Sequence, residues 1–104
     1  MVASYKRAHR DLVHPGIVKE LRQCGYSVFE THHIGGGFPD LVVGYGGITT
    51  LVELKSPKAL QRGAHLEESQ KDFIRDWRGA TPLVAETTEQ IIAHFKGRIH
   101  GRLD

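Results

Sequence analysis

Two acidic residues and one lysine lie close together in the segment GGGFPDLVVGYGGITTLVELK, which runs from Gly35 to Lys55. Asp40 follows a proline at the start of one apolar run, and Glu53 and Lys55 end the next one. Charged side chains at one end of an apolar hairpin are costly to keep unless they are used. Mg²⁺ takes oxygen ligands, often one or two carboxylates together with substrate phosphate. We therefore expect these residues to serve a divalent cation.

The two apolar runs are predicted to be strands joined by a turn at Gly46-Gly47. Side chains alternate between the two faces of a strand, so Glu53 and Lys55 point one way while Val52 and Leu54 point the other. Asp40 opens the neighbouring strand, which brings it close to that pair.

Length and composition describe an ordinary globular domain. The 104 residues suffice for one domain with a single core, and hydrophobic and charged contents are 39% and 25%. A net charge of +2 is weak evidence for a polyanionic partner. The single Cys24 excludes an intrachain disulfide and a cysteine-rich zinc site. No apolar signal core or membrane-spanning run is present, so the expected location is the cytoplasm.

The first helix is expected to follow a basic N-terminal arm, residues 1–10. Pro15 suits its first turn and Gly25 its end, and its apolar positions are Ile17, Leu21 and Cys24. Glu20 borders this apolar stripe on a helical wheel. It is either a solvated helix glutamate or part of a metal shell.

A short strand, Tyr26 to Glu30, leads to His32 and His33. Adjacent strand residues face opposite ways, so we expect one histidine to pack near the site and the other to be solvated. The glycines that follow do not continue as the GxGxxG of a dinucleotide loop. Gly36 and Gly37 instead permit a tight turn beside the acids, or the close approach of a phosphodiester backbone.

After Lys55 comes a polar loop that contains Ser56, Lys58 and Arg62. These residues either hold a phosphate backbone or form an ordinary solvated loop. The next helix is predicted from Leu66 to Arg78, ending at Gly79, with Gln70 on its inward stripe beside Leu66, Phe73, Ile74 and Trp77. A buried glutamine needs partners: water, phosphate, the Lys55 ammonium, or backbone groups.

The chain closes with a strand and a helix. The strand is predicted over Thr81 to Thr87, starting near Pro82, and Thr87 forms a capping box with Gln90. The helix turns Ile91, Ile92 and Phe95 inward, and residues 97–104 form a basic tail. The predicted order is helix, three strands, helix, strand, helix: an α/β (α+β) domain whose mixed central sheet is flanked by helices.

This order, with Pro39-Asp40 and Glu53-Leu54-Lys55, resembles the PD-(D/E)xK nuclease superfamily with its restriction-endonuclease-like core. GGGFPDLVVG, LVELKSP and the helix with Gln70 are most similar to the small stand-alone VRR-NUC nucleases found in phages. The resemblance covers about Asp11 to Ile99. It implies a Mg²⁺-dependent endonuclease, with Mn²⁺ able to substitute, that cuts DNA. Branched DNA such as Holliday junctions is the leading substrate class.

By this resemblance, Asp40, Glu53 and the backbone carbonyl of Leu54 bind the metal. Lys55 activates or positions water or neutralises charge, and Gln70 matches a recurrent helix glutamine. Relatives often carry an acid before an Ile-Val pair in the first helix, where this chain has Gly16. Glu20, one turn later, is the candidate replacement.

The small surface of the domain predicts a homodimer that presents two sites to two strands. Two alternatives remain open. One is a catalytically silent module that binds nucleic acid or a protein, and the other is a nickase or ribonuclease of the same fold.

Overall fold

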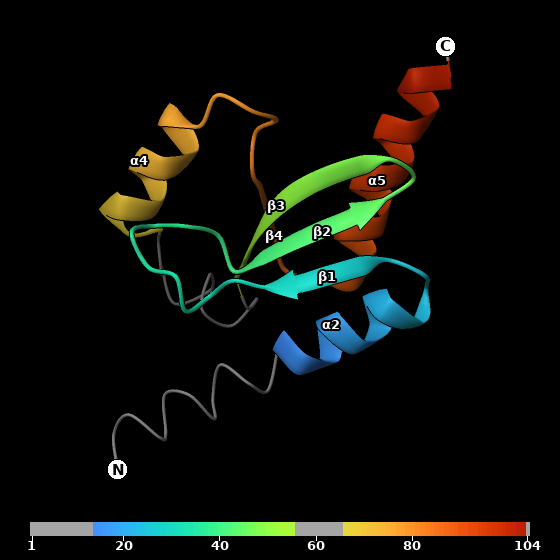
Figure 1. The fold of residues 1–104 in the computed structure, drawn as a ribbon, viewed down its shortest axis with the longest axis horizontal. Helices are drawn as coiled ribbons and strands as arrows, with labels where there is room; N and C mark the ends of the chain where they lie inside the picture. The colour runs from blue at the N-terminus through green and yellow to red at the C-terminus, as the bar shows by residue number, and fades with distance from the viewer. Residues whose placement is uncertain (1–13, 56–65, 104) are drawn as a thin grey trace.

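The computed structural model describes residues 14–55 and 66–103, and its elements follow the predicted order (Figure 1). They are helix α2 (His14–Gln23), strands β1 (Ser27–Glu30), β2 (Leu41–Tyr45) and β3 (Ile48–Leu54), helix α4 (Glu68–Asp76), strand β4 (Leu83–Ala85) and helix α5 (Thr88–Leu103). The described residues therefore form a small α+β domain with three helices and a four-stranded mixed sheet, as the sequence predicted at this level.

The sheet has the order β1-β2-β3-β4. β1 and β3 each pair with β2 in antiparallel fashion, whereas β4 runs parallel to β3. The predicted Gly46-Gly47 turn joins the paired residues Tyr45 and Ile48, and both glycines have positive φ (59° and 78°). A two-residue hairpin turn of this kind needs positive φ at both positions, which glycine adopts at low cost.

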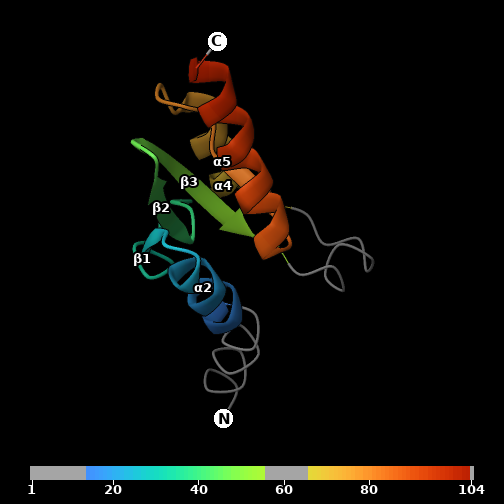
Figure 2. The same cartoon turned by 90° about the vertical axis from the view of Figure 1, so that its right-hand side faces the viewer.

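One face of the sheet is covered by α2 and α5, which lie on the same side of it (Figure 2). The core consists of buried residues from both helices and from alternate strand positions: Ile17, Val18, Leu21, Tyr26, Leu41, Val43, Ile48, Val52, Leu54, Ala85, Ile91 and Phe95. The inward positions predicted for Ile17, Leu21, Ile91 and Phe95 are confirmed. The prediction for Cys24 was wrong, because α2 ends at Gln23 and Cys24 lies exposed in the turn to Gly25.

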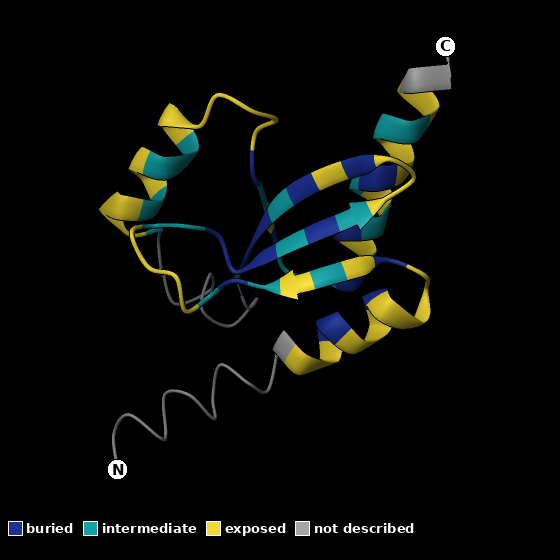
Figure 3. Ribbon diagram, in the orientation of Figure 1, coloured by how far each residue is buried: buried dark blue, intermediate teal, exposed yellow. Residues whose placement is uncertain are grey.

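α4 stands apart from this core, beside the segment that connects β1 to β2 (Figure 1). It has no buried residue, and Figure 3 shows only exposed and intermediate positions along it. The helix ends at Asp76 instead of Arg78, because Trp77 has an extended backbone with ψ of 125°. Gly79 is therefore not the residue that stops it.

The cap predicted for α5 is half confirmed. The Gln90 backbone N–H donates to Thr87 Oγ1 over 3.1 Å, but the Gln90 side chain accepts from the Glu86 N–H (2.6 Å) rather than from Thr87. Residues 97–103, expected as a tail, continue the helix. Arg98 in this segment donates to Thr50 Oγ1 on β3 over 3.2 Å, which ties the last turns to the sheet.

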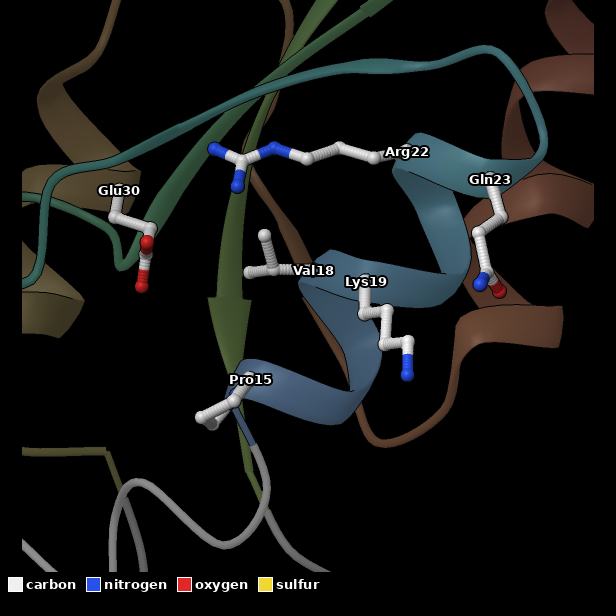
Figure 4. Close-up of a pocket in the computed structure, with 6 residues that line it drawn as sticks. All are labelled: Pro15, Val18, Lys19, Arg22, Gln23 and Glu30. Carbon is white, nitrogen blue, oxygen red and sulfur yellow. The ribbon is translucent and has the colours of Figure 1, made fainter.

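A shallow groove runs between α2 and the edge strand β1, lined by Pro15, Val18, Lys19, Arg22, Gln23 and Glu30 (Figure 4). Arg22 Nη2 donates to the Val28 carbonyl oxygen over 2.8 Å. An edge strand carries backbone groups that invite pairing with another chain, so this contact protects the edge. No helix in the described part of the chain is long and apolar enough to cross a membrane.

Candidate active site

The strand register brings Asp40 and Glu53 to the same end of the sheet. Leu41 pairs with Val52, so one further step along the two antiparallel strands places Asp40 opposite Glu53. Directly opposed residues project from the same face of a sheet. Both side chains are nearly inaccessible, with relative exposures of 4% and 3%. The proximity of these carboxylates, predicted from the hairpin, is confirmed.

Asp40 is held by hydrogen bonds on both sides. Its Oδ2 accepts the Leu54 N–H at 2.9 Å. Its backbone carbonyl accepts the Thr31 N–H at 2.7 Å, and the neighbouring Pro39 carbonyl accepts Thr31 Oγ1 at 2.8 Å. These bonds fix the carboxylate between β1 and β3. Thr31 is itself buried. The sequence analysis did not identify it, and its only distinguishing feature in the sequence is its position before the two histidines.

Glu53 meets two side chains at the same oxygen. Lys55, which directly follows β3, has its Nζ 3.7 Å from Glu53 Oε2, so the two side chains point to the same side as predicted. Gln70 Nε2 on α4 donates to the same Oε2 over 2.7 Å. A buried carboxylate is stabilised when a cation and hydrogen-bond donors reach it.

Gln70 bridges the carboxylate and the start of its own helix. Its Oε1 accepts the Glu67 N–H at 2.8 Å, while the Glu67 side chain caps the Gln70 N–H, forming a capping box. Gln70 thus contacts Glu53 with its amide nitrogen and backbone with its amide oxygen. Backbone was among the partners proposed for Gln70, and the Glu67 N–H is such a partner. Glu53 was not among them.

The glycine run lets the β1–β2 connection approach α4. Gly35, Gly36 and Gly37 all have positive φ (84°, 64° and 81°). A methyl group at Gly37 would collide with the Ser69 carbonyl and lie 3.0 Å from the Gln70 nitrogen, whereas one at Gly36 would meet nothing within 4 Å. Gly37 is thus required for the close approach of the helix that carries Gln70, and Gly36 remains open on the surface.

Glu20 is engaged on the other side of the sheet. Its Oε1 accepts a hydrogen bond from Thr88 Oγ1 at 2.8 Å, across the contact between α2 and α5. Glu53 alternates with the core residues Val52 and Leu54, so it points away from the face that these helices cover. Within residues 14–55 and 66–103, no three His, Cys, Asp or Glu side chains are grouped to hold a metal ion. The structure therefore does not bring Glu20 to the strand carboxylates.

The remaining predicted residues are distributed as follows. His32 and His33 lie in a turn instead of a strand, with ring centroids 5.7 Å apart in an edge-to-face arrangement. Ser56, Lys58 and Arg62, like the arm at residues 1–10, lie outside the described residues. Gly16 is exposed near the start of α2.

Two buried carboxylates on neighbouring strands, with the Leu54 carbonyl next in the chain, form a set of hard oxygen donors. Such a set suits Mg²⁺, which is commonly held by one or two carboxylates and keeps its other positions for water and substrate phosphate. The site thus fits an ion that is shared with a ligand rather than fully enclosed by the protein. No protein-family model, curated protein sequence or solved structure matches this chain.

Proposed function

We propose that this protein is a Mg²⁺-dependent endonuclease that hydrolyses DNA phosphodiester bonds, with a core of the restriction-endonuclease-like PD-(D/E)xK type. The observation that supports it most is the convergence of Asp40, Glu53 and Lys55 at one end of the sheet, with Gln70 bonded to Glu53. Each of the four was singled out by residue type and spacing. A surface salt bridge would not need two carboxylates that are almost fully buried.

Phosphodiester hydrolysis requires a nucleophilic water and stabilisation of negative charge in the transition state. When bound, Mg²⁺ held by Asp40, Glu53 and the Leu54 carbonyl would lower the pKa of a coordinated water and polarise a phosphoryl oxygen. Asp40 is pre-oriented for this role by the Leu54 N–H. Such pre-orientation reduces the reorganisation needed during the reaction.

Lys55 acts beside the carboxylates. Its side chain is 19% exposed and ends 3.7 Å from Glu53 Oε2, so its ammonium stands between the buried acid and solvent. From there it either neutralises charge on the transition state or, as a general base, takes the proton of the attacking water. Gln70 holds the Glu53 carboxylate in a defined orientation and is a positioning residue in this scheme.

Branched DNA is the proposed substrate, and a homodimer the proposed active form. Both rest on the resemblance and on the size of the domain. A symmetric dimer would place two copies of the site against two strands of a junction.

The test is a cleavage assay with Mg²⁺ or Mn²⁺ on labelled junction, flap, linear duplex, single-stranded DNA and RNA. The wild-type protein should cut DNA and prefer the branched forms. Lys55→Ala should lower the cleavage rate by about 10²–10⁴-fold without changing the unfolding midpoint. Lys96→Ala, an exposed lysine on α5, is the matched control and should cut normally. Normal cleavage by the Lys55 variant would contradict the role assigned here.

A catalytically silent module is the second candidate, favoured by the engagement of Glu20 with Thr88 and by the glycine at position 16. The Glu20→Gln variant distinguishes a metal-binding role of Glu20 from a purely structural role in the contact with Thr88. We expect it to cut at the wild-type rate, since its carboxylate serves a helix contact. DNA binding without cleavage of any substrate, in either metal, would favour the silent module.

A further inference from the structure

Three aromatic rings form a continuous row that leads away from the carboxylates. The row is Phe38, Phe73 and Trp77. Phe38 meets Phe73 edge to face with ring centroids 5.2 Å apart, and Phe73 stacks on Trp77 at 5.1 Å and 18°. Phe38 lies two residues before Asp40, and Phe73 lies one helical turn after Gln70. One end of the aromatic row is therefore anchored at the site.

Trp77, the last ring, is exposed and yet held in place. It retains 42% of its accessible surface. Phe73 stacks on it, and a Cβ at Gly79 would come within 2.7 Å of its Nε1, so the chain beyond α4 also passes against the indole. The Phe38–Phe73 contact already joins α4 to the β1–β2 connection. Attachment of the helix does not require Trp77, and leaving a large aromatic surface in water is unfavourable.

Charge along the aromatic row is mixed, with acidic and basic side chains on α4 and a cation near each end of the row. The segment 31–39 that supplies Phe38 contains no acidic residue. Asp72 and Asp76 on α4 share one cation, Arg75, at 3.1 and 2.8 Å, so one of their two negative charges is offset. Lys55 stands near one end of the row and the exposed Arg78 follows its other end.

The dimensions suit a nucleic-acid strand. Gln70 and Trp77 are seven residues apart, which is two helical turns or about 10 Å along a helix axis. A stacked strand advances about 3.4 Å per nucleotide, so this length corresponds to about three nucleotides. Proteins that bind single strands stack successive bases on aromatic side chains, since every base offers a π face.

We infer that Trp77, the exposed end of the aromatic row, stacks on a base of an unpaired DNA strand, about three nucleotides from the phosphate at Asp40 and Glu53. This inference deepens the proposed function and depends on it only for the placement of that phosphate. It gives a physical reason for a preference for flaps and other branched DNA that carries an unpaired strand, because paired bases inside a duplex do not offer their faces to a side chain.

Trp77 is the one tryptophan in the sequence, so intrinsic fluorescence reports on it directly. The protein is titrated in Ca²⁺ without Mg²⁺, which we use to suppress cleavage, with a 12-nucleotide single strand, a hairpin duplex, and an abasic strand of the same length. The single strand should quench Trp77 emission and bind about 5–100-fold more tightly than the abasic strand. The duplex should leave the emission nearly unchanged.

Variants are tested by anisotropy of the dye-labelled single strand. Trp77→Ala should lose the preference over the abasic strand, and Trp77→Phe should partly restore it. Tyr45→Ala is the matched control: Tyr45 is 41% exposed and stacks on Tyr26 at 4.1 Å, but it lies at the other end of β2. Its preference should be unchanged. Unfolding midpoints confirm that each variant is folded.

Equal affinity for the native and abasic strands, or an emission unaffected by the single strand, would overturn the inference. So would a change in emission with protein concentration alone that DNA does not alter, since a second copy would then occupy the row. The two proposals fail separately. Quenching and base preference with no DNA cleavage in Mg²⁺ would refute the nuclease proposal and support base binding by the aromatic row. Normal cleavage with no base preference would support the nuclease and refute base binding.

Discussion

At the scale of single residues, the site depends on side chains that each have an assigned partner. Asp40 accepts the Leu54 N–H, Glu53 accepts Gln70, and Lys55 is drawn to Glu53. A buried carboxylate without such partners would be expensive. The partners therefore determine the orientation of both acids before any ligand arrives.

A histidine away from the site should control the acid stability of the fold. Burial lowers the pKa of His94 below its ordinary value of 6.5, and the positive charge of Arg98 lowers it further. Its buried Nε2 has no hydrogen-bond partner among the described residues, and its ring meets Phe95 edge to face. Below pH 6.5 the unfolded chain binds the proton more readily than the folded chain, so stability falls as pH falls through this range.

We predict that the urea midpoint of the wild-type protein decreases between pH 7.5 and pH 5.5, and that His94→Gln shows a smaller decrease. His100→Gln, an exposed histidine on the same helix, is the control and should follow the wild type. Identical pH dependence in wild type and His94→Gln would contradict the prediction.

At the scale of elements, α4 is the part of the site that is attached by few contacts. It has no buried residue, and the described contacts that join it to the other elements include Gln70 with Glu53, Phe73 with Phe38, and the close approach of Ser69 to Gly37. Stability in proteins is uneven, and segments with little buried surface open most readily. The placement of Gln70 therefore depends on a tight contact between two backbones.

Gly37→Ala should break this contact. The new methyl group collides with Ser69, so α4 must move and Gln70 loses Glu53, while the left-handed φ adds about 1–2 kcal/mol of strain. We expect slower cleavage, a lower unfolding midpoint and a shifted Trp77 emission. Gly36 also has a positive φ, but a methyl group there meets nothing within 4 Å. Gly36→Ala should therefore lower the unfolding midpoint only through backbone strain, and its Trp77 emission should match that of the wild type. Equal effects of the two variants would show that the contact is unimportant.

At the scale of the whole molecule, one face of the sheet is covered by α2 and α5, and the other carries an apolar line across three strands. Phe29, Val42 and Leu51 are in register on this second face, and Phe29 is 70% exposed. Exposed apolar surface of this kind often marks an interface. Pairing through the edge of β1 is disfavoured by Arg22, which already occupies the Val28 carbonyl.

We predict that light scattering coupled to size-exclusion chromatography gives twice the chain mass of 11.6 kDa. Phe29→Ser should shift the protein toward monomer at micromolar concentration, because it removes a large apolar group from the interface. Tyr45→Ser, a 41% exposed residue that stacks on the core residue Tyr26, should leave the mass unchanged. A monomeric wild type at all concentrations would contradict the dimer.

The sequence alone determined the order of the elements and the pairing of Asp40, Glu53 and Lys55, since the pleat of a strand and a two-glycine turn are local properties. It also placed Gln70 on the inward side of its helix. Tertiary structure decided what these residues meet. Gln70 is 17 positions from Glu53, and Thr88 is 68 positions from Glu20. Such contacts depend on how helices dock on the sheet, which local periodicity does not specify. For the same reason, only the folded chain shows that Gly37 serves α4, that Glu20 lies across the sheet from the acids, and that three separate rings form one row.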